Sequence, residues 1–299
     1  MQDLQPDFKA GFVNIVGKPN VGKSTLVNAL MGERLSIVTS KAQTTRHRIM
    51  GIWNEPNFQV AYSDTPGILK PAYPLHKAMM DFVTGSLEDA DLVIFVADIF
   101  DKEIDETILR RINTVEAPLI LVINKTDLAK ADQAQIEATR LHWYSVLRPK
   151  ACFQISALNK VGIDELKAAI LEYIPVHPPY FDQENYTNRT ERFFASEIIR
   201  EKIFIQYKEE IPYCSEVVID GFKEKEDIIV ITARILVERD TQKGILIGQG
   251  GDAIKKLGIA ARADLEAFFG KKVFLEQQVK VEPDWRSKVN VLNKLGYQG

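Results

Sequence analysis

The stretch GKPNVGKST, residues 17–25, matches the pattern G-x-x-x-x-G-K-[ST]. The apolar run FVNIVG leads into it and the helical pattern LVNALMG follows it, which is the strand–loop–helix context that this pattern needs. Glycines in such a loop let backbone N–H groups surround phosphate oxygens, and the start of the next helix adds positive dipole. The stretch therefore predicts a phosphate-binding loop. We expect the contacts to come from Gly17, Lys18, Pro19, Asn20, Val21, Gly22, Lys23, Ser24 and Thr25.

Two residues of this loop and a second motif predict the chemistry at the phosphates. Lys23 is expected to span the β- and γ-phosphates, and the Ser24 hydroxyl to hold Mg²⁺. The motif DTPG closes the apolar run FQVAYSD, so that Asp64 is placed to hold Mg²⁺ through water and the Gly67 N–H to meet the γ-phosphate. The expected phosphate contacts of this motif are Asp64, Thr65, Pro66 and Gly67.

The polar loop KAQTTRHRI, upstream of DTPG, offers two adjacent threonines. One of them could place a hydroxyl and a carbonyl on Mg²⁺ when GTP is bound. We prefer Thr45, which directly precedes Arg46, over Thr44. The arginines Arg46 and Arg48 could act as arginine fingers, but we expect them to be solvated residues of an exposed loop.

The motif NKTD, at the end of another apolar run, indicates which base is bound. An aspartate carboxylate there can accept both guanine N1–H and the exocyclic amine, and adenine presents no such pair of donors. The short motif SAL ends the next predicted strand and is the expected second contact to the base. The predicted guanine site consists of Asn124, Lys125, Asp127, Ser156 and Ala157.

The predicted strands share one pattern: each is a nearly continuous apolar run, at residues 12–17, 58–64, 92–98, 119–125 and 152–156. Helical segments separate most of them, which predicts a doubly wound, largely parallel α/β sheet covered on both faces. Ligands of such sheets bind at the carboxyl ends of the strands, where each motif falls. We expect this domain to span residues 1–175.

A proline-rich polar stretch, PVHPPYFDQENYTNRT, predicts a linker at residues 176–190. The part that follows, 191–299, reads in the order α-β-β-α-α-β, with a possible hairpin across KEKED, and predicts a small α+β domain. A second glycine loop, GQGG, lies between its last two helices. The residues expected to bind a nucleic-acid backbone there are Lys243, Gly248, Gln249, Gly250, Gly251, Lys255 and Lys256.

The motif order GKPNVGKS, TTR, DTPG, NKTD and SAL resembles translation-factor-class GTPases. The resemblance implies that the γ-phosphate orders two switch loops and that hydrolysis releases them. Many such proteins carry a glutamine after the DxxG glycine to orient water, whereas this chain has Ile68. We therefore expect slow intrinsic hydrolysis; the alternative is that the backbone, another side chain or an ion holds the water. In similar GTPases with an apolar residue there, an asparagine at the position of Asn20 helps to hold K⁺; the alternative is that Asn20 forms a turn.

The GQGG loop with its flanking helices and strands resembles a type II KH domain, and together the two parts resemble the Era family of bacterial ribosome-assembly GTPases over almost the whole chain. This resemblance implies binding of GTP and GDP, Mg²⁺ as cofactor, and binding to 16S ribosomal RNA near its 3′ end during maturation of the 30S subunit. It also implies some peripheral association with the inner face of the cell membrane. The loop departs from the family pattern in having Gln249 and Gly250 at its variable positions, without lysine.

Composition sets limits on the remaining possibilities. The net charge of −3 gives no global sign of a polyanionic partner, although a local basic patch is enough for one. The chain lacks an apolar run of about 18 residues and a signal-peptide pattern, so we expect a cytoplasmic protein, acting as a monomer. Two rivals stay open: a metabolic enzyme that uses GTP, which would need a second catalytic cluster, and a membrane-surface GTPase, which would need a basic amphipathic face.

Overall fold

The computed structural model describes residues 7–100, 106–128 and 132–297. The first six residues of the N-terminal stretch, for which no signal peptide is expected, lie outside the described residues. The chain divides into two compact units. The first comprises residues 7–72 and 76–188, and the second comprises 189–297 together with Tyr73–Leu75. Within the described ranges, the helices are too short or too polar to cross a membrane.

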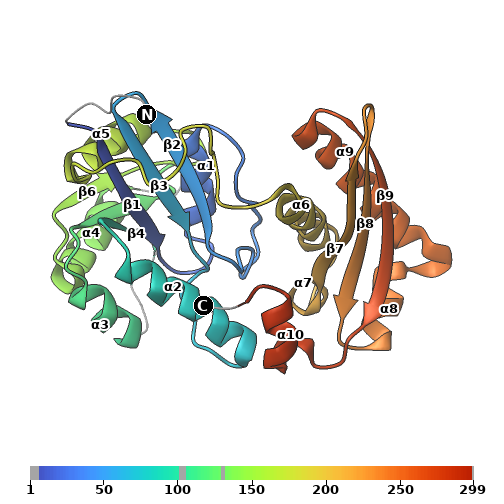
Figure 1. The fold of residues 1–299 in the computed structure, drawn as a ribbon. Coiled ribbons are helices and arrows are strands. Elements are labelled where there is room, and N and C mark those ends of the chain that lie inside the picture. Colours follow the sequence, from blue (N-terminus) through green and yellow to red (C-terminus); the bar gives the residue numbers. More distant parts are fainter. Residues whose placement is uncertain (1–6, 101–105, 129–131, 298–299) are drawn as a thin grey trace. The chain divides into compact units, whose positions relative to one another are not determined.

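The first unit is built on a six-stranded sheet in the order β2-β3-β1-β4-β5-β6 (Figure 1). All neighbouring strands are parallel except β2 and β3. The predicted doubly wound, mostly parallel α/β fold is confirmed. The strands are β1 (Lys9–Val16), β2 (Ile49–Glu55), β3 (Phe58–Asp64), β4 (Leu92–Asp98), β5 (Leu119–Asn124) and β6 (Ala151–Gln154).

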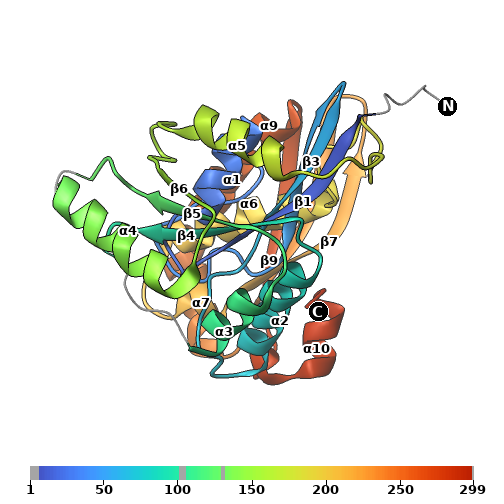
Figure 2. The same cartoon turned by 90° about the vertical axis from the view of Figure 1, so that its left-hand side faces the viewer.

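Helices cover both faces of this sheet, with α1 and α5 on one side and α2, α3 and α4 on the other (Figure 2). The central strands β4 and β5 are buried along almost their whole length, which explains why they read as unbroken apolar runs. The helices are α1 (Lys23–Met31), α2 (Pro74–Glu88), α3 (Glu106–Thr114), α4 (Gln133–Leu147) and α5 (Ile163–Tyr173).

Strand β2 was absent from the predicted strands. It pairs antiparallel with β3 at the edge of the sheet and includes Gly51, where an added Cβ would lie 2.6 Å from a Leu35 side-chain atom. A glycine within the run and the polar NEPN that ends it weakened the strand pattern. The pairing places Ile49 opposite Asp64, so β2 starts beside the end of the strand that carries the DTPG aspartate. The loop that leads into β2 and contains Thr44 and Thr45 (residues 39–48) is called the threonine loop below.

The segment expected to be a linker packs against the first unit up to residue 188. The Ala10 N–H donates to the Pro175 carbonyl, and the Ile52 N–H on the free edge of β2 donates to the Tyr186 carbonyl. The buried Gln59 side chain accepts hydrogen bonds from the Tyr180 and Phe181 N–H groups. The prolines of this segment are compatible with a path along the outside of the sheet, because few of the segment's own N–H groups have to take part in strand pairing.

The second unit contains a three-stranded sheet in the order β7-β8-β9, with β7 and β8 antiparallel and β8 and β9 parallel. Helices α6, α8 and α9 supply apolar side chains to its core. The expected order α-β-β-α-α-β and the hairpin are present, and the short helices α7 and α10 were not predicted. The elements are α6 (Glu191–Gln206), α7 (Ile211–Cys214), β7 (Glu216–Glu224), β8 (Ile228–Val237), α8 (Asp240–Ile247), α9 (Asp252–Phe269), β9 (Lys272–Val281) and α10 (Val289–Lys294), with 3₁₀ turns η1 (Gln249–Gly251) and η2 (Trp285–Ser287).

Candidate nucleotide and nucleic-acid sites

Two glycines of the phosphate loop occupy positions that other residues would not fit. Gly17 and Gly22 both have positive φ, 154° and 97°. A Cβ at Gly17 would lie 2.2 Å from the Val96 carbonyl oxygen, and a Cβ at Gly22 would lie 2.3 Å from the Asn124 amide nitrogen. The loop is therefore pressed against the ends of β4 and β5, with its backbone free to follow a phosphate chain.

A cavity of about 320 Å³ opens over this loop. The phosphate loop forms one wall, the polar loop between α1 and β2 forms another, and the DTPG glycine and the NKTD lysine complete the lining. Its lining residues from the predicted site are Pro19, Asn20, Gly22, Lys23, Ser24, Thr25, Thr45, Gly67 and Lys125.

Three predicted Mg²⁺ residues converge at one corner of the cavity. The Thr45 hydroxyl lies 2.9 Å from the Ser24 hydroxyl and donates to an Asp64 carboxylate oxygen at 3.4 Å. Thr44 instead directs its hydroxyl into its own loop, to Thr39 at 2.6 Å and to the Lys41 carbonyl at 2.7 Å. This geometry favours Thr45 over Thr44 as the residue that reaches the metal corner.

Asp64 is fully buried at the end of β3. Burial raises the pKa of its carboxyl group, while hydrogen bonding from Ser24 and the charge of Lys23 oppose that rise. Among the described residues, its Oδ1 atom has no hydrogen-bond partner. A buried carboxylate oxygen beside two hydroxyls is the donor set that Mg²⁺ prefers, so the residues present fit this ion.

The rest of the phosphate end is held by backbone contacts. The Lys23 ammonium donates to the Lys18 carbonyl at 2.8 Å, which curls the side chain over the loop. A Cβ on Gly67 would lie 2.6 Å from the Pro19 Cα atom, so the DTPG backbone lies directly against the phosphate loop. The Thr65 hydroxyl donates into β1 at the Ile15 carbonyl, and this side chain therefore supports the strand rather than facing the cavity.

The residue after DTPG, Ile68, is 4% exposed, and its N–H donates to the Gly17 carbonyl. A buried aliphatic side chain can supply no hydrogen bond to a water molecule. Asn20 lies on the other side of the loop with φ 65°, and its amide nitrogen donates to the Ser40 carbonyl at 3.0 Å. Asn20 thus links the phosphate loop to the threonine loop in addition to shaping its own turn.

The predicted guanine residues meet at the ends of β5 and β6. Asn124 donates to the Val21 carbonyl at 2.9 Å and accepts from the Ala157 N–H at 3.0 Å, so it joins the phosphate loop to the SAL motif. The exposed Asp127 carboxylate accepts from the Ser156 hydroxyl at 2.5 Å, which holds it at the rim of the site.

Some residues of the site differ from expectation or were missed. Arg46 and Arg48 are not solvated: Arg46 is buried, and the Arg48 side chain is 14% exposed in an ion pair with Asp89. A loop pattern alone does not show which cations are drawn back onto the sheet. Asp98, which pairs with Lys125 at 3.4 Å, was not singled out, although it ends a predicted strand at the edge where ligands bind.

The second glycine loop has the backbone expected of a close-approach site. Gly248, Gly250 and Gly251 have positive φ of 73°, 59° and 84°. Gly250 is exposed, as are Lys255 and Lys256 near the start of α9. The three glycines and the start of α9 thus form an open, positively flanked turn that leaves room for a phosphate backbone.

These two sites define a class: a P-loop GTPase domain followed by a KH domain. The family model described as "50S ribosome-binding GTPase" matches residues 12–125, and the model "KH domain" matches residues 210–286.

The similarity to known proteins covers almost the whole length of this chain. The chain is 40% identical to GTPase Era of Geotalea uraniireducens, covering 98% of this chain and 99% of that one, and 42% identical to chloroplastic GTPase ERA1 of Zea mays, covering 99% and 72%. A crystal structure of Era in complex with MgGDPNP and nucleotides 1506–1542 of 16S ribosomal RNA aligns with TM-score 0.92 at 37% identity, covering 98% and 100%. A crystal structure of an Aquifex aeolicus Era variant bound to GDP·AlF₄⁻ aligns with the same values. This chain belongs to the Era family of GTPases.

Proposed function

We propose that this GTPase is a switch that binds 16S ribosomal RNA near its 3′ end when it holds GTP and assists maturation of the 30S subunit. The observation that carries the proposal is the position of Thr45, whose hydroxyl lies against both Ser24 and Asp64. A threonine from the loop before β2 thus reaches the metal corner of the phosphate site, where contacts to Mg²⁺ and the γ-phosphate would order this loop. The crystal structure of Era with MgGDPNP and 16S RNA nucleotides supports the choice of ligands.

The residues at the phosphate end divide the work among them. The backbone of the phosphate loop and Lys23 would hold the β- and γ-phosphates, and the Gly67 N–H would meet the γ-phosphate. Ser24, Thr45 and Asp64 would hold Mg²⁺, which supplies charge neutralisation at the phosphates when bound. At the other end, Asp127 would accept from guanine, and Asn124, Lys125, Ser156 and Ala157 would position the base.

We infer that intrinsic hydrolysis is slow, because the buried Ile68 leaves the attacking water without a side-chain partner at this position. Asn20 and the Ser40 carbonyl lie together at the rim of the phosphate loop and would supply oxygen ligands to K⁺. The Asn20 amide would have to turn over for its oxygen to face the ion, because its nitrogen faces Ser40 in this structure.

The second unit would bind the RNA. Its GQGG turn would let the backbone of a single strand lie close to Gly250 and Gly251, with Lys243, Lys255 and Lys256 near the phosphates. We further propose a cytoplasmic monomer that associates peripherally with the membrane.

The experiment is RNA binding by fluorescence anisotropy with the intact chain. A single-stranded oligonucleotide matching the 16S 3′ end is compared with a scrambled one, for the unaltered protein and for Gly250→Asp. We expect selective binding that Gly250→Asp weakens about tenfold or more, because a carboxylate is placed where a phosphate should lie. Affinity that is the same for both oligonucleotides and for both proteins would contradict the proposal. Selective RNA binding, rather than flotation with liposomes, separates the proposal from the membrane-surface rival, because both include association with a membrane.

A further inference from the structure

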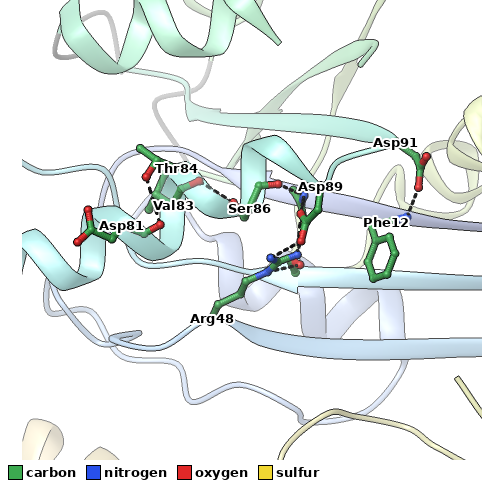
Figure 3. Close-up of polar contacts among 10 residues, drawn as sticks. Phe12, Arg48, Asp81, Val83, Thr84, Ser86, Asp89 and Asp91 are labelled. Atoms are coloured by element: carbon green, nitrogen blue, oxygen red, sulfur yellow. Dashed lines mark hydrogen bonds and ion pairs between the residues drawn. The ribbon is translucent and has the colours of Figure 1, made fainter. Parts of the chain in front are cut away.

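A cluster around Arg48 lies outside the nucleotide cavity and joins elements that the site depends on. The Arg48 guanidinium forms two hydrogen bonds with the Asp89 carboxylate, at 2.6 and 3.0 Å. Its Nε atom donates to the Ser63 hydroxyl at 3.0 Å, and one terminal nitrogen donates to the Asn14 side-chain oxygen at 3.3 Å. Figure 3 shows the guanidinium facing Asp89. One side chain therefore connects the start of β2 to β1, β3 and the residue after α2.

Arg48 is joined to the metal corner by two short stretches of chain, one through its own backbone and one through its hydrogen-bond partner Ser63. Arg48 follows Thr45 by three positions, and Ser63 directly precedes Asp64. Ile49, the next residue after Arg48, is paired with Asp64 in the β2–β3 ladder. Three residues span at most about 10 Å, so fixing Arg48 restricts where the Thr45 hydroxyl can go.

The third connection holds the end of the helix that follows DTPG. Glu88 and Asp89 place negative charge at the C-terminal end of α2, where the helix dipole is also negative, and the last turn of α2, which lies wholly within the described residues, carries no basic side chain. Arg48 brings a positive charge to this end. Asn14 strengthens the joint by donating to Asp89 at 3.0 Å and to the Ser86 carbonyl.

We propose that Arg48 is a positioning residue for GTP binding and hydrolysis. It fixes the far ends of the threonine loop and of the segment after DTPG, so that Thr45 and Asp64 stand together when the γ-phosphate is present. The proposal rests on the roles given to Thr45 and Asp64 above. We expect Thr45 to reach Mg²⁺ when GTP is bound, so Arg48 should matter for GTP and not for GDP.

The test compares the affinities of Arg48→Met for a fluorescent non-hydrolysable GTP analogue and for fluorescent GDP. We expect analogue affinity and kcat to fall about tenfold, with GDP affinity unchanged, because a charge-assisted two-point anchor is lost. Asp89→Asn weakens the same anchor at a half-exposed position and should also lower the ratio of analogue affinity to GDP affinity. It replaces Arg48→Met as the test variant if Arg48→Met folds poorly. The matched control is Arg111→Met, which removes an ion pair with Glu88 at the same helix end but has no connection to the threonine loop.

A structural role alone would lower the melting temperature and change both affinities together, or neither, and that result would overturn the proposal. Thr45→Ala serves as the reference. If Thr45→Ala lowers the analogue-to-GDP affinity ratio while Arg48→Met and Asp89→Asn leave it at the Arg111→Met value, the role of Arg48 is wrong and the site stands. If Thr45→Ala itself leaves the ratio unchanged, the assignment of the metal corner fails, and the role of Arg48 fails with it.

Discussion

The amide nitrogen of Asn124 lies 2.9 Å from the carbonyl oxygen of Val21, which joins the base-recognition motif to the phosphate loop. The Asn124 oxygen accepts from the Ala157 N–H, so one carboxamide holds three motifs that are far apart in the sequence. The proposed base and phosphate sites are therefore joined into one hydrogen-bonded unit.

Replacing Asn124 by alanine should weaken GDP and the GTP analogue equally, by about tenfold, because two hydrogen bonds of a buried carboxamide are lost and neither depends on the γ-phosphate. Fluorescent-nucleotide titration measures both affinities. Asn113→Ala is the control, since it removes one exposed side-chain contact, to the Val146 carbonyl, away from the site. A selective loss of analogue binding would show that Asn124 acts through the switch loops instead.

Hydrolysis should be faster in KCl than in NaCl of equal concentration if Asn20 and the Ser40 carbonyl hold K⁺. We expect a rate increase of about tenfold, since a cation beside the phosphates stabilises developing charge. Asn20→Ala should remove the difference between the two salts. Equal rates in both salts for the unaltered protein would leave Asn20 as a loop-shaping residue that bonds to Ser40.

Two glycines of the second loop should differ in their effect on stability. A Cβ at Gly248 would lie 2.6 Å from the Ala253 Cβ, whereas a Cβ at Gly250 would meet no heavy atom of the described residues within 4 Å. Gly250→Ala should therefore cost about 1 kcal/mol, from positive φ alone, and Gly248→Ala should cost more. Thermal unfolding of the two variants measures this order. Equal losses would mean that the loop relaxes around Gly248.

The thiol of Cys152 should react slowly. Burial raises its pKa to about 11 from an ordinary 9.0, and the charge of Arg140 opposes that rise. Because the pKa is higher in the folded protein, the stability contributed by this thiol is complete below about pH 9 and is lost as the pH rises toward 11. Alkylation of the native protein at about pH 9 should be some 50-fold slower than after unfolding, with Cys152→Ser identifying the site. Native labelling at the rate of a small thiol would contradict this.

The sequence predicted those strands well whose pattern is set by burial of apolar side chains. Strands β3 and β4 were predicted to the residue because they are buried along almost their whole length and therefore read as nearly continuous apolar runs. β2 was not predicted because this edge strand contains Gly51 and ends in polar residues, so it lacks such a run. The role of Arg48 depends on Asp89, which is 41 positions away in the chain, and a long-range ion pair leaves no local pattern. The packing of residues 176–188 depends likewise on distant partners such as Gln59.

We expect the bound nucleotide to control RNA binding. The measurement is the RNA affinity of the intact chain with a non-hydrolysable GTP analogue, with GDP and without nucleotide. RNA binding should be about tenfold tighter with the analogue than with GDP, and RNA should raise the analogue-to-GDP affinity ratio by the same factor, because linkage is reciprocal. In Lys23→Ala the RNA affinity should be the same with the analogue and with GDP, because nucleotide binding is weakened, while the second unit keeps its basal RNA affinity. The same RNA affinity in all three nucleotide states would show that the bound nucleotide does not control RNA binding.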